Sequence, residues 1–411
     1  MATIAENLTL LKSTKAGIKA AIEAKGVSNV GDKFSDYPAK IASIPTGGGG
    51  VSQWTGTVDR AGLTELGWST TDIDNFQANV RWYDWQDPDY AVVDADKSIT
   101  DISQYSNNKD VRYAKMLDTS QVTNMSSKFY DCTRLTSIPT LDTSQVTDMR
   151  YMFVSCSSLT TIPALDTSKV TRMDYMFNNC TSLTSIPTLD TSKVTDMRNM
   201  FQGCTSLTSI PALDTSQATN MNSIFSGCTS LTSIPALNTS KVTNMGGMFV
   251  GCSRLTSIPA LDTSKVTDMN SMFHRCTSLT TIPALDTSKV TNMYSMFGGC
   301  TSLTSIESID FSSCTSTGYM FPSHYDYSKL TSIHVTGSIS FSWTSDGFSS
   351  IPNLDFNSIK SILEAMNRCT NPETAKTMSF KATMTDQDSQ LTNLVSECNG
   401  KGWTITGLTI N

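Results

Sequence analysis

The residues of this sequence best suited to chemistry are its eleven cysteines, its three histidines and a regularly spaced set of aspartates. Eight of the cysteines follow one another at a constant step of 24 residues, from Cys132 to Cys300. A zinc site needs closely paired thiolates such as Cys-x-x-Cys, and disulfides need an oxidising compartment. The spacing therefore predicts a column of reduced, buried thiols that act as small apolar groups, with no metal centre.

The aspartates follow the same step, and each is followed by Thr-Ser. They are Asp118, Asp142, Asp166, Asp190, Asp214, Asp262 and Asp286. Stacked carboxylates suit calcium. One equivalent position, however, holds Asn238, which keeps the acceptor oxygen and loses the charge. Capping of a turn by the side-chain oxygen explains both residue types, so we favour capping over calcium binding.

Catalytic patterns are scarce. The three histidines are His274, His324 and His334, and the chain contains no Gly-x-Ser-x-Gly, phosphate-binding loop or dinucleotide fingerprint. A polysaccharide depolymerase needs two carboxylates roughly 5–10 Å apart, and nothing singles out one aspartate pair. We expect no catalytic residue, no cofactor and no enzymatic activity.

Charge and hydropathy narrow the partners. The formal charge of −7 argues against nucleic acid, which requires a basic face. No run of 18 apolar residues occurs, so we expect no membrane insertion. The N-terminal sequence lacks the apolar core of a signal peptide, which predicts folding in a cytoplasm.

The 24-residue step organises most of the chain. Nonamers similar to LDTSQVTNM begin at Leu117 and recur every 24 residues to Leu285. In the unit 261–284, eight apolar positions recur: Leu261, Val266, Met269, Met272, Phe273, Cys276, Leu279 and Ile282. Positions that recur at one step face a shared interior, so the units are expected to stack as the coils of a solenoid.

Each unit predicts its own local structure. Residues 266–269 alternate apolar and polar, which predicts a short strand, and residues 273–282 predict a curved segment entering an extended one. Asp286-Thr287-Ser288 predicts the turn between coils. One helical or 3₁₀ turn between Met269 and Cys276 would point Met272 and Phe273 inward.

The phrases LDTSKVTNM, MFxxC and TSLTSIP resemble the BspA-like leucine-rich repeats of bacterial and phage surface proteins, over about residues 117–306. The resemblance implies an α/β-type leucine-rich-repeat solenoid that is β-rich, with short helical turns, an N-terminal helix and α+β terminal caps. It also implies binding of a ligand or a host surface.

Residues 3–25 predict an amphipathic helix, with Lys15 at one position of its apolar stripe. The other stripe residues are Ile4, Leu8, Leu11, Ile18 and Ile22. This stripe fits either a short oligomeric bundle or packing within one chain. The helix sequence, YPAKIASIP and the glycine run together resemble the N-terminal anchoring segment of tailed-phage virion proteins. That resemblance implies attachment to a virion as an oligomer.

The expected domains are a helical anchor at 1–46, a glycine linker at 47–50, a Trp-rich N-terminal cap at 51–116, an eight-unit solenoid at 117–308, and a degenerate repeat with a C-terminal cap at 309–411. Four of the six tryptophans lie in the N-terminal cap. They suit either sugar stacking or covering the open first coil, and we favour the second.

The C-terminal cap predicts four elements. Residues 355–369 and 386–400 predict helices, the second capped at or near Asp386. Residues 377–384 and 402–411 predict strands.

The positions that vary between units are the candidates for recognition, because a repeat holds its core fixed and varies what faces out. The expected ligand-binding residues are Tyr130, Arg150, Tyr151, Asp174, Tyr175, Arg198, His274, Arg275 and Tyr294. Tyr, Arg, Asp and Asn on a rigid surface suit carbohydrate or protein ligands. Neutral drift of solvent-facing residues is the alternative.

We therefore expect a phage virion fibre or appendage protein at the virion surface. Residues 1–46 would bind other virion proteins, the solenoid would bind a bacterial surface receptor, and the assembly would be a homotrimer. The alternatives are a purely structural capsid-decorating or tail-building protein, a bacterial surface adhesin, and a depolymerase.

Overall fold

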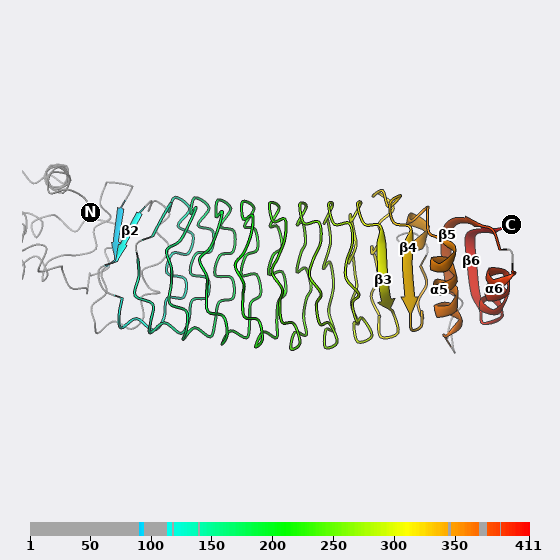
Figure 1. Ribbon diagram of the computed structural model, residues 1–411, viewed down its shortest axis with the longest axis horizontal. Coiled ribbons are helices and arrows are strands. Elements are labelled where there is room, and N and C mark those ends of the chain that lie inside the picture. The colour runs from blue at the N-terminus through cyan, green and yellow to red at the C-terminus, as the bar shows by residue number, and fades with distance from the viewer. Residues whose placement is uncertain are drawn as a thin grey trace, which may run out of the picture.

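The described part of the chain is a long row of stacked coils that ends in two helices and two strands (Figure 1). The computed structural model describes residues 90–93, 113–116, 119–138, 140–343, 347–369, 376–386 and 388–411. The predicted anchor at 1–46, its oligomerisation residues and the linker at 47–50 lie outside these ranges. Most of the predicted cap at 51–116 lies outside them as well.

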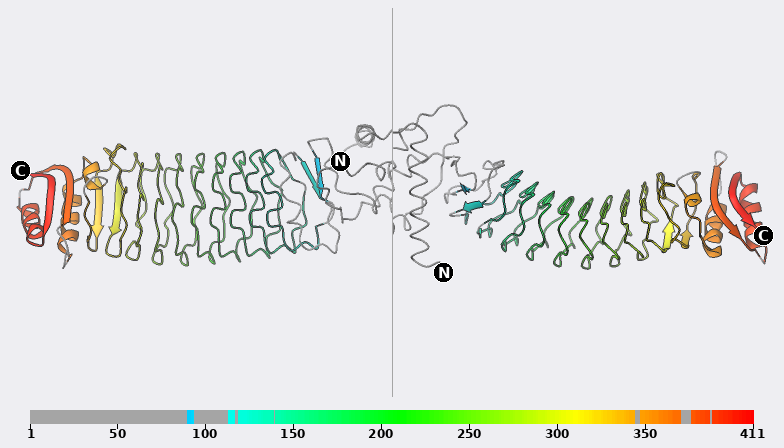
Figure 2. Two further views of the ribbon diagram at one scale, coloured as in Figure 1. Left: turned by 180° about the vertical axis from the view of Figure 1, so that it is seen from behind. Right: turned by 90° about the horizontal axis from the view of Figure 1, so that it is seen from above.

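The eight repeating apolar positions form the core, as predicted. Met269, Met272 and Phe273 are fully buried. The phenylalanines stack along the solenoid from Phe129 to Phe321, with neighbouring ring centroids 5.4–5.9 Å apart. The result is an LRR-like solenoid with one continuous core, and the row curves gently when seen from above (Figure 2).

Proline limits regular strand structure on one face of the solenoid. Strand β3 (Ser305–Asp310) pairs in parallel with β4 (Ser332–Thr336). The position of Glu307 in β3 is occupied by Pro283 one coil earlier, and by proline in each preceding unit back to Pro139. Because proline has no N–H to donate, the ladder breaks there. On this face the coil before β3 therefore makes an isolated bridge, Thr281 to Ser305.

A strand pair lies inside the predicted N-terminal cap. Strand β1 (Tyr90–Val93) pairs in parallel with β2 (Tyr113–Met116), with Tyr90 opposite Tyr113. These strands were not predicted. Their offset of 23 residues is close to the step of the solenoid. Parallel stacking at nearly one coil per layer therefore begins before residue 117.

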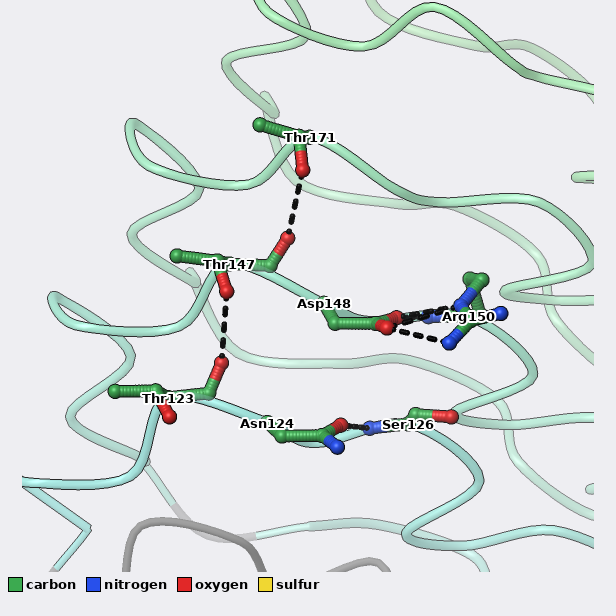
Figure 3. Close-up of polar contacts among 7 residues, drawn as sticks. All are labelled: Thr123, Asn124, Ser126, Thr147, Asp148, Arg150 and Thr171. Carbon is green, nitrogen blue, oxygen red and sulfur yellow. Dashed lines mark hydrogen bonds and ion pairs between the residues drawn. The ribbon is translucent and has the colours of Figure 1, made fainter.

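The short strand predicted at residues 266–269 and their equivalents is reduced to a single bridging residue per coil. Examples are the bridges from Asn124 to Asp148 and from Asp148 to Arg172. Beside it runs a ladder of exposed threonines (Figure 3). The Thr147 N–H and hydroxyl both donate to the Thr123 carbonyl, at 2.8 and 3.2 Å. These bonds join successive coils and hold the bridging residues in register.

The turn between Met269 and Cys276 is present, but it is not helical. The Met272 N–H donates to the Met269 carbonyl at 3.2 Å, as in a 3₁₀ turn. Ser271 and Arg275, however, have φ values of 53° and 60°. A helix cannot include such left-handed residues, so the segment is a run of separate tight turns. The prediction of short helical turns is wrong here, while Met272 and Phe273 point inward as predicted.

The four predicted C-terminal elements are confirmed. They are α5 (Phe356–Asn367), β5 (Lys376–Met384), α6 (Gln390–Gly400) and β6 (Trp403–Ile410), preceded by the short helix η3 (Phe348–Ser350). Asp355 caps α5 by accepting from the Ser358 N–H, and Asp386 accepts from the Thr392 N–H in the first turn of α6. Strands β5 and β6 are parallel, and α5 packs against β4 and α6. Within the described ranges, no helix has the length and apolar character to cross a membrane.

Candidate functional site

All nine predicted ligand-binding residues lie in one segment of the repeat, the tight turns between Met269 and Cys276 and their equivalents in other coils. We define the turn face as the positions equivalent to 270, 271, 274 and 275 in each coil, which lie between the inward-pointing methionines, phenylalanine and cysteine. Each coil contributes two pairs of positions to this face, one pair at 270 and 271 and the other at 274 and 275.

Two of these four positions are left-handed in successive coils. Residues equivalent to 271 and 275 have φ between 53° and 79°, and most of them are Gly, Asn, Asp or Ser. These residue types tolerate left-handed backbone. Much of the variation between units therefore reflects what the backbone accepts, and variation alone does not mark recognition.

Four residues depart from this pattern: Tyr151, Tyr175, Arg275 and Tyr319 all have φ between 56° and 61°. A bulky side chain in this conformation costs roughly 1–2 kcal/mol relative to glycine. The energetic preference of the backbone therefore does not explain why they occupy these positions.

Hydrogen bonds between coils fix the left-handed residues. The Ser271 N–H donates to the Tyr294 carbonyl at 2.7 Å, and the Arg275 N–H donates to the Gly298 carbonyl at 2.6 Å. Between them the His274 N–H closes a tight turn on the Ser271 carbonyl at 3.0 Å. These main-chain groups hold neighbouring coils together and are not available to a ligand.

One group of predicted residues lies in neighbouring coils near the N-terminal end of the turn face. The rings of Tyr151 and Tyr175 stack with centroids 5.0 Å apart and an interplanar angle of 19°. Arg150 makes a bidentate pair with Asp148 at 2.7–2.9 Å (Figure 3), which raises the pKa of Arg150. Arg198 is paired as well, since its Nε lies 3.1 Å from Asp196 Oδ2. Both arginines near the tyrosines therefore already have a carboxylate partner.

The structure contradicts the prediction that Asp174 binds a ligand at the surface. Its side chain lies between these coils and the residue is only 2% exposed, so it is not a surface ligand-binding residue. Burial raises the pKa of its carboxyl, and the nearby Asp196 raises it further. One oxygen, Oδ1, makes no hydrogen bond.

A second group forms near the C-terminal end of the turn face and includes the predicted residues His274, Arg275 and Tyr294. His274 Nδ1 lies 2.9 Å from the Ser295 hydroxyl, and Arg275 Nε donates to the Tyr325 hydroxyl at 3.2 Å. The structure adds Tyr319 to this group, with its ring centroid 5.6 Å from that of Tyr294 in an edge-on arrangement.

Tyr319 was missed by the sequence prediction, although the repeat contains the signal. It lies one 24-residue step after Ser295, in a stretch that keeps Met320 and Phe321 in phase. Tyr130, the remaining predicted residue, is 38% exposed at a position equivalent to His274, in the first coil of the repeat.

Glycines make room for the rings of the second group. A Cβ on Gly298 would lie 2.6 Å from His274 Nδ1, and one on Gly318 would lie 3.2 Å from the Tyr294 ring. At Gly299, with a φ of 79°, a Cβ would lie 3.1 Å from the Tyr325 ring. The side chains of His274, Tyr294 and Tyr325 therefore lie directly on the backbone of a neighbouring coil.

The cysteine column is buried, and its thiols are free. From Cys156 to Cys300 each thiol of the column donates to a phenylalanine carbonyl in the preceding coil, for example Cys276 Sγ to Phe249 at 3.0 Å. Burial raises the pKa of the Cys204 thiol to about 12. Such thiols are inert, which agrees with the predicted structural role.

The aspartate column caps the turns between coils, as predicted. Asp262 Oδ1 accepts from the Ser264 N–H at 3.0 Å, and Asn238 Oδ1 accepts equivalently from Ser240 at 3.2 Å. The Ser264 hydroxyl and N–H lower the pKa of Asp262. In the described ranges, no three His, Cys, Asp or Glu residues cluster as metal ligands.

Three overlapping stretches of the chain, residues 97–209, 184–257 and 219–334, match the family described as Mycoplasma protein of unknown function, DUF285. No curated protein sequence matches the chain. These matches begin after residue 50, so they lend no support to the resemblance of residues 1–50 to phage anchoring segments.

Two solved structures are similar to parts of the chain. The leucine-rich repeat protein of T. pallidum is 19% identical, with 52% of this chain and 83% of that chain covered and a TM-score of 0.29. A TLR13–ssRNA13 complex is 12% identical, with 77% and 54% covered and a TM-score of 0.26. Since the three family matches together span residues 97–334, more than half of the sequence, the chain belongs to the DUF285 family.

Proposed function

We propose that this protein is a virion fibre or appendage protein whose turn face binds a carbohydrate or protein ligand on a bacterial surface. The observation that carries the proposal is the presence of Tyr151, Tyr175, Arg275 and Tyr319 at left-handed positions. Strained residues of this kind are typical of functional sites. Their neighbours in the same columns, such as Asn199 and Gly251, show which residues the backbone accepts.

The construction of the solenoid supports a binding role. The continuous phenylalanine stack and the bonds between coils make a stiff scaffold, and the turn face presents side chains at fixed spacing on it. A rigid surface loses little conformational entropy on binding. In this proposal residues 1–46 join three copies of the chain and attach them to other virion proteins.

The test is a variant that replaces the four strained residues with residues the columns already contain: Tyr151→Asn, Tyr175→Asn, Arg275→Gly and Tyr319→Asn. Binding of the full chain to a panel of bacterial cells is measured by flow cytometry. The proposal predicts that wild-type protein binds at least one strain and that the variant loses this binding while staying folded.

The matched control changes the same columns without touching the large side chains, as Ser223→Asn and Gly251→Asn. This control is expected to bind like the wild type. Full binding by the four-residue variant would contradict the proposal and would favour a purely structural role as a stiff spacer.

A bacterial surface adhesin is the second candidate function. The family description names Mycoplasma, which favours a bacterial source. Both candidates use the same turn face, and they differ in where the chain resides. Light scattering on the full chain and on a version that starts at Val51 tests the virion proposal. A trimer that becomes a monomer on truncation supports an assembly role for residues 1–46.

A further inference from the structure

We infer that the C-terminal end of the turn face is a binding site for an acidic saccharide, formed by Tyr294, Tyr319, His274 and Arg275. The inference rests on the proposed function, because it assigns a ligand class to one part of the same face. We call these four residues the acidic-sugar site.

The tyrosines provide an exposed aromatic platform. Tyr294 is 44% exposed and Tyr319 is 50% exposed, and with Tyr130 they are the exposed large apolar side chains of the described ranges. Their rings lie 5.6 Å apart at an angle of 63°. Two exposed rings at an angle offer a C–H-rich sugar ring a face and an edge, which suits a small ligand with apolar and polar sides.

The platform is supported from below. The Tyr294 ring packs closely against Gly318, where an added Cβ would lie 3.2 Å from the ring. Tyr319 follows Gly318 directly, and its φ of 56° fixes the direction in which its side chain leaves the backbone. The Gly318 carbonyl accepts from the Ser295 N–H at 2.8 Å, so both tyrosines are held on bonded backbone.

Basic groups lie beside the platform, at the positions equivalent to 274 and 275. The Arg275 side chain is exposed and uses Nε for its bond to Tyr325. His274 binds the Ser295 hydroxyl through Nδ1, which orients the ring and leaves Nε2 for a ligand. The ring centroid of His324 lies 4.3 Å from that of Tyr325, so a third basic side chain lies near Arg275.

Arg275 gives this site an exposed positive side chain, although the whole chain carries −7. Burial lowers the pKa of His274, and Arg275 and His324 lower it further. The neutral imidazole that a lowered pKa favours can still form a hydrogen bond with a ligand through Nε2. The guanidinium of Arg275, held at Nε by the Tyr325 hydroxyl, can pair with a carboxylate, which is why the site favours an acidic sugar over a neutral one.

The main chain argues against a peptide ligand. A peptide that adds to a protein edge needs free N–H and C=O groups. At this site the Tyr294, Gly298 and Gly318 carbonyls accept bonds from the preceding coil. A ligand at this site must therefore be recognised by side chains, as is usual for proteins that bind sugars. An acidic peptide is nevertheless included as a competing probe in the test.

The experiment is isothermal titration calorimetry on the full chain with a panel of uronic-acid oligosaccharides, each matched to its neutral hexose counterpart. At least one uronate is expected to bind roughly tenfold more tightly than its neutral counterpart, and more weakly at high salt. Tyr294→Ala with Tyr319→Ala is expected to weaken that binding by roughly tenfold or more. Arg275→Gly is expected to remove most of the preference for the uronate.

The control is Ser223→Asn, which changes the same column as Tyr319 four coils earlier and is expected to leave the uronate affinity unchanged. The inference is overturned if no uronate binds more tightly than its neutral counterpart, if the Tyr294 and Tyr319 variant binds as wild type does, or if an acidic peptide binds more tightly than every uronate.

Cell binding separates the two proposals. If wild-type chain binds cells and the four-residue variant does not, the proposed function stands whatever the calorimetry shows. If cell binding stands and uronates do not bind, the assignment to an acidic saccharide is wrong and the attachment role survives.

Discussion

At the scale of single residues, Lys128 stands out because it occupies a core column that holds methionine in most other coils, for example Met152 and Met176. The residue is 1% exposed, and burial lowers its pKa to about 7. In the unfolded chain a lysine titrates near its ordinary value, so between about pH 7 and pH 10 the unfolded state binds a proton that the native state does not.

The sign of this linkage gives a prediction. Stability should rise with pH between about 7 and 10, and the full penalty should apply below about pH 7. Lys128→Met should raise the free energy of unfolding at pH 7 by about 2–4 kcal/mol and remove the slope. Urea denaturation of both proteins from pH 6 to 10 measures this, and an unchanged slope in the variant would show that Lys128 is not its source.

Asp174 offers a second prediction at this scale. Its carboxyl is buried with one unpaired oxygen, and its pKa is raised. A raised carboxyl pKa means that the native state binds the proton more tightly, so stability falls as the pH rises from the unfolded value through the folded value.

Asp174→Asn, which places there the residue found at Asn222 and Asn270, should therefore increase stability at pH 7 by on the order of 1 kcal/mol. The gain should shrink near pH 4. Thermal unfolding at the two pH values measures it. A loss of stability at pH 7 would mean that attraction to the surrounding arginines outweighs burial.

At the scale of the elements, the turn segment of each coil depends on its left-handed positions. Gly227 has a φ of 75°, and a Cβ there would meet the Gly203 backbone no closer than 3.4 Å. Space is therefore sufficient, and backbone conformation decides the outcome.

Gly227→Val should destabilise the protein by about 2 kcal/mol, because a β-branched residue is the least tolerant of this region. Gly227→Asn should lower stability by less than about 1 kcal/mol, since Asn179 occupies the same column. Thermal melts of the two variants compare them directly. Equal losses would indicate that crowding, and not φ, controls this position.

The elements also show what the sequence reveals and what it hides. The core positions were predictable, because repetition marks every inward residue eight times over. The non-helical turn was harder to predict, although Gly203, Gly227 and Gly251 in one column signal left-handed backbone. Proline in the extended segment likewise explains why this segment forms a regular strand in β3, where Glu307 replaces the proline of the preceding units.

The candidate site was predictable in part for the same reason. The repeat predicts His274, Arg275 and Tyr294 as site residues. Extending the repeat by one more unit would also have predicted Tyr319. The ring of Tyr325 reaches the site from a loop after Pro322 that breaks the period. The burial of Asp174 depends on how neighbouring coils pack, and a pattern within one unit does not contain that information.

At the scale of the whole molecule, the cysteine column predicts a chain that is indifferent to redox conditions while folded. The thiols from Cys132 to Cys300 are buried, and burial raises the pKa of Cys252 and Cys300 to about 12. Alkylation requires an exposed thiolate.

Iodoacetamide at pH 8 should therefore leave these eight cysteines unmodified in native protein and label all of them after unfolding, as read by peptide mass spectrometry. A reductant should not change the melting temperature. Rapid labelling of the central coils would contradict the tightly packed column.

The central claim is that the strained residues of the turn face are there for binding and not for stability. Its most direct test is the free energy of unfolding of the chain with Tyr151→Asn, Tyr175→Asn, Arg275→Gly and Tyr319→Asn, measured beside wild type by urea denaturation. Relief of strain at four positions, less the lost stacking of Tyr151 on Tyr175, predicts a gain of about 1–3 kcal/mol. A loss of stability would contradict the claim, because it would show that these side chains hold the solenoid together.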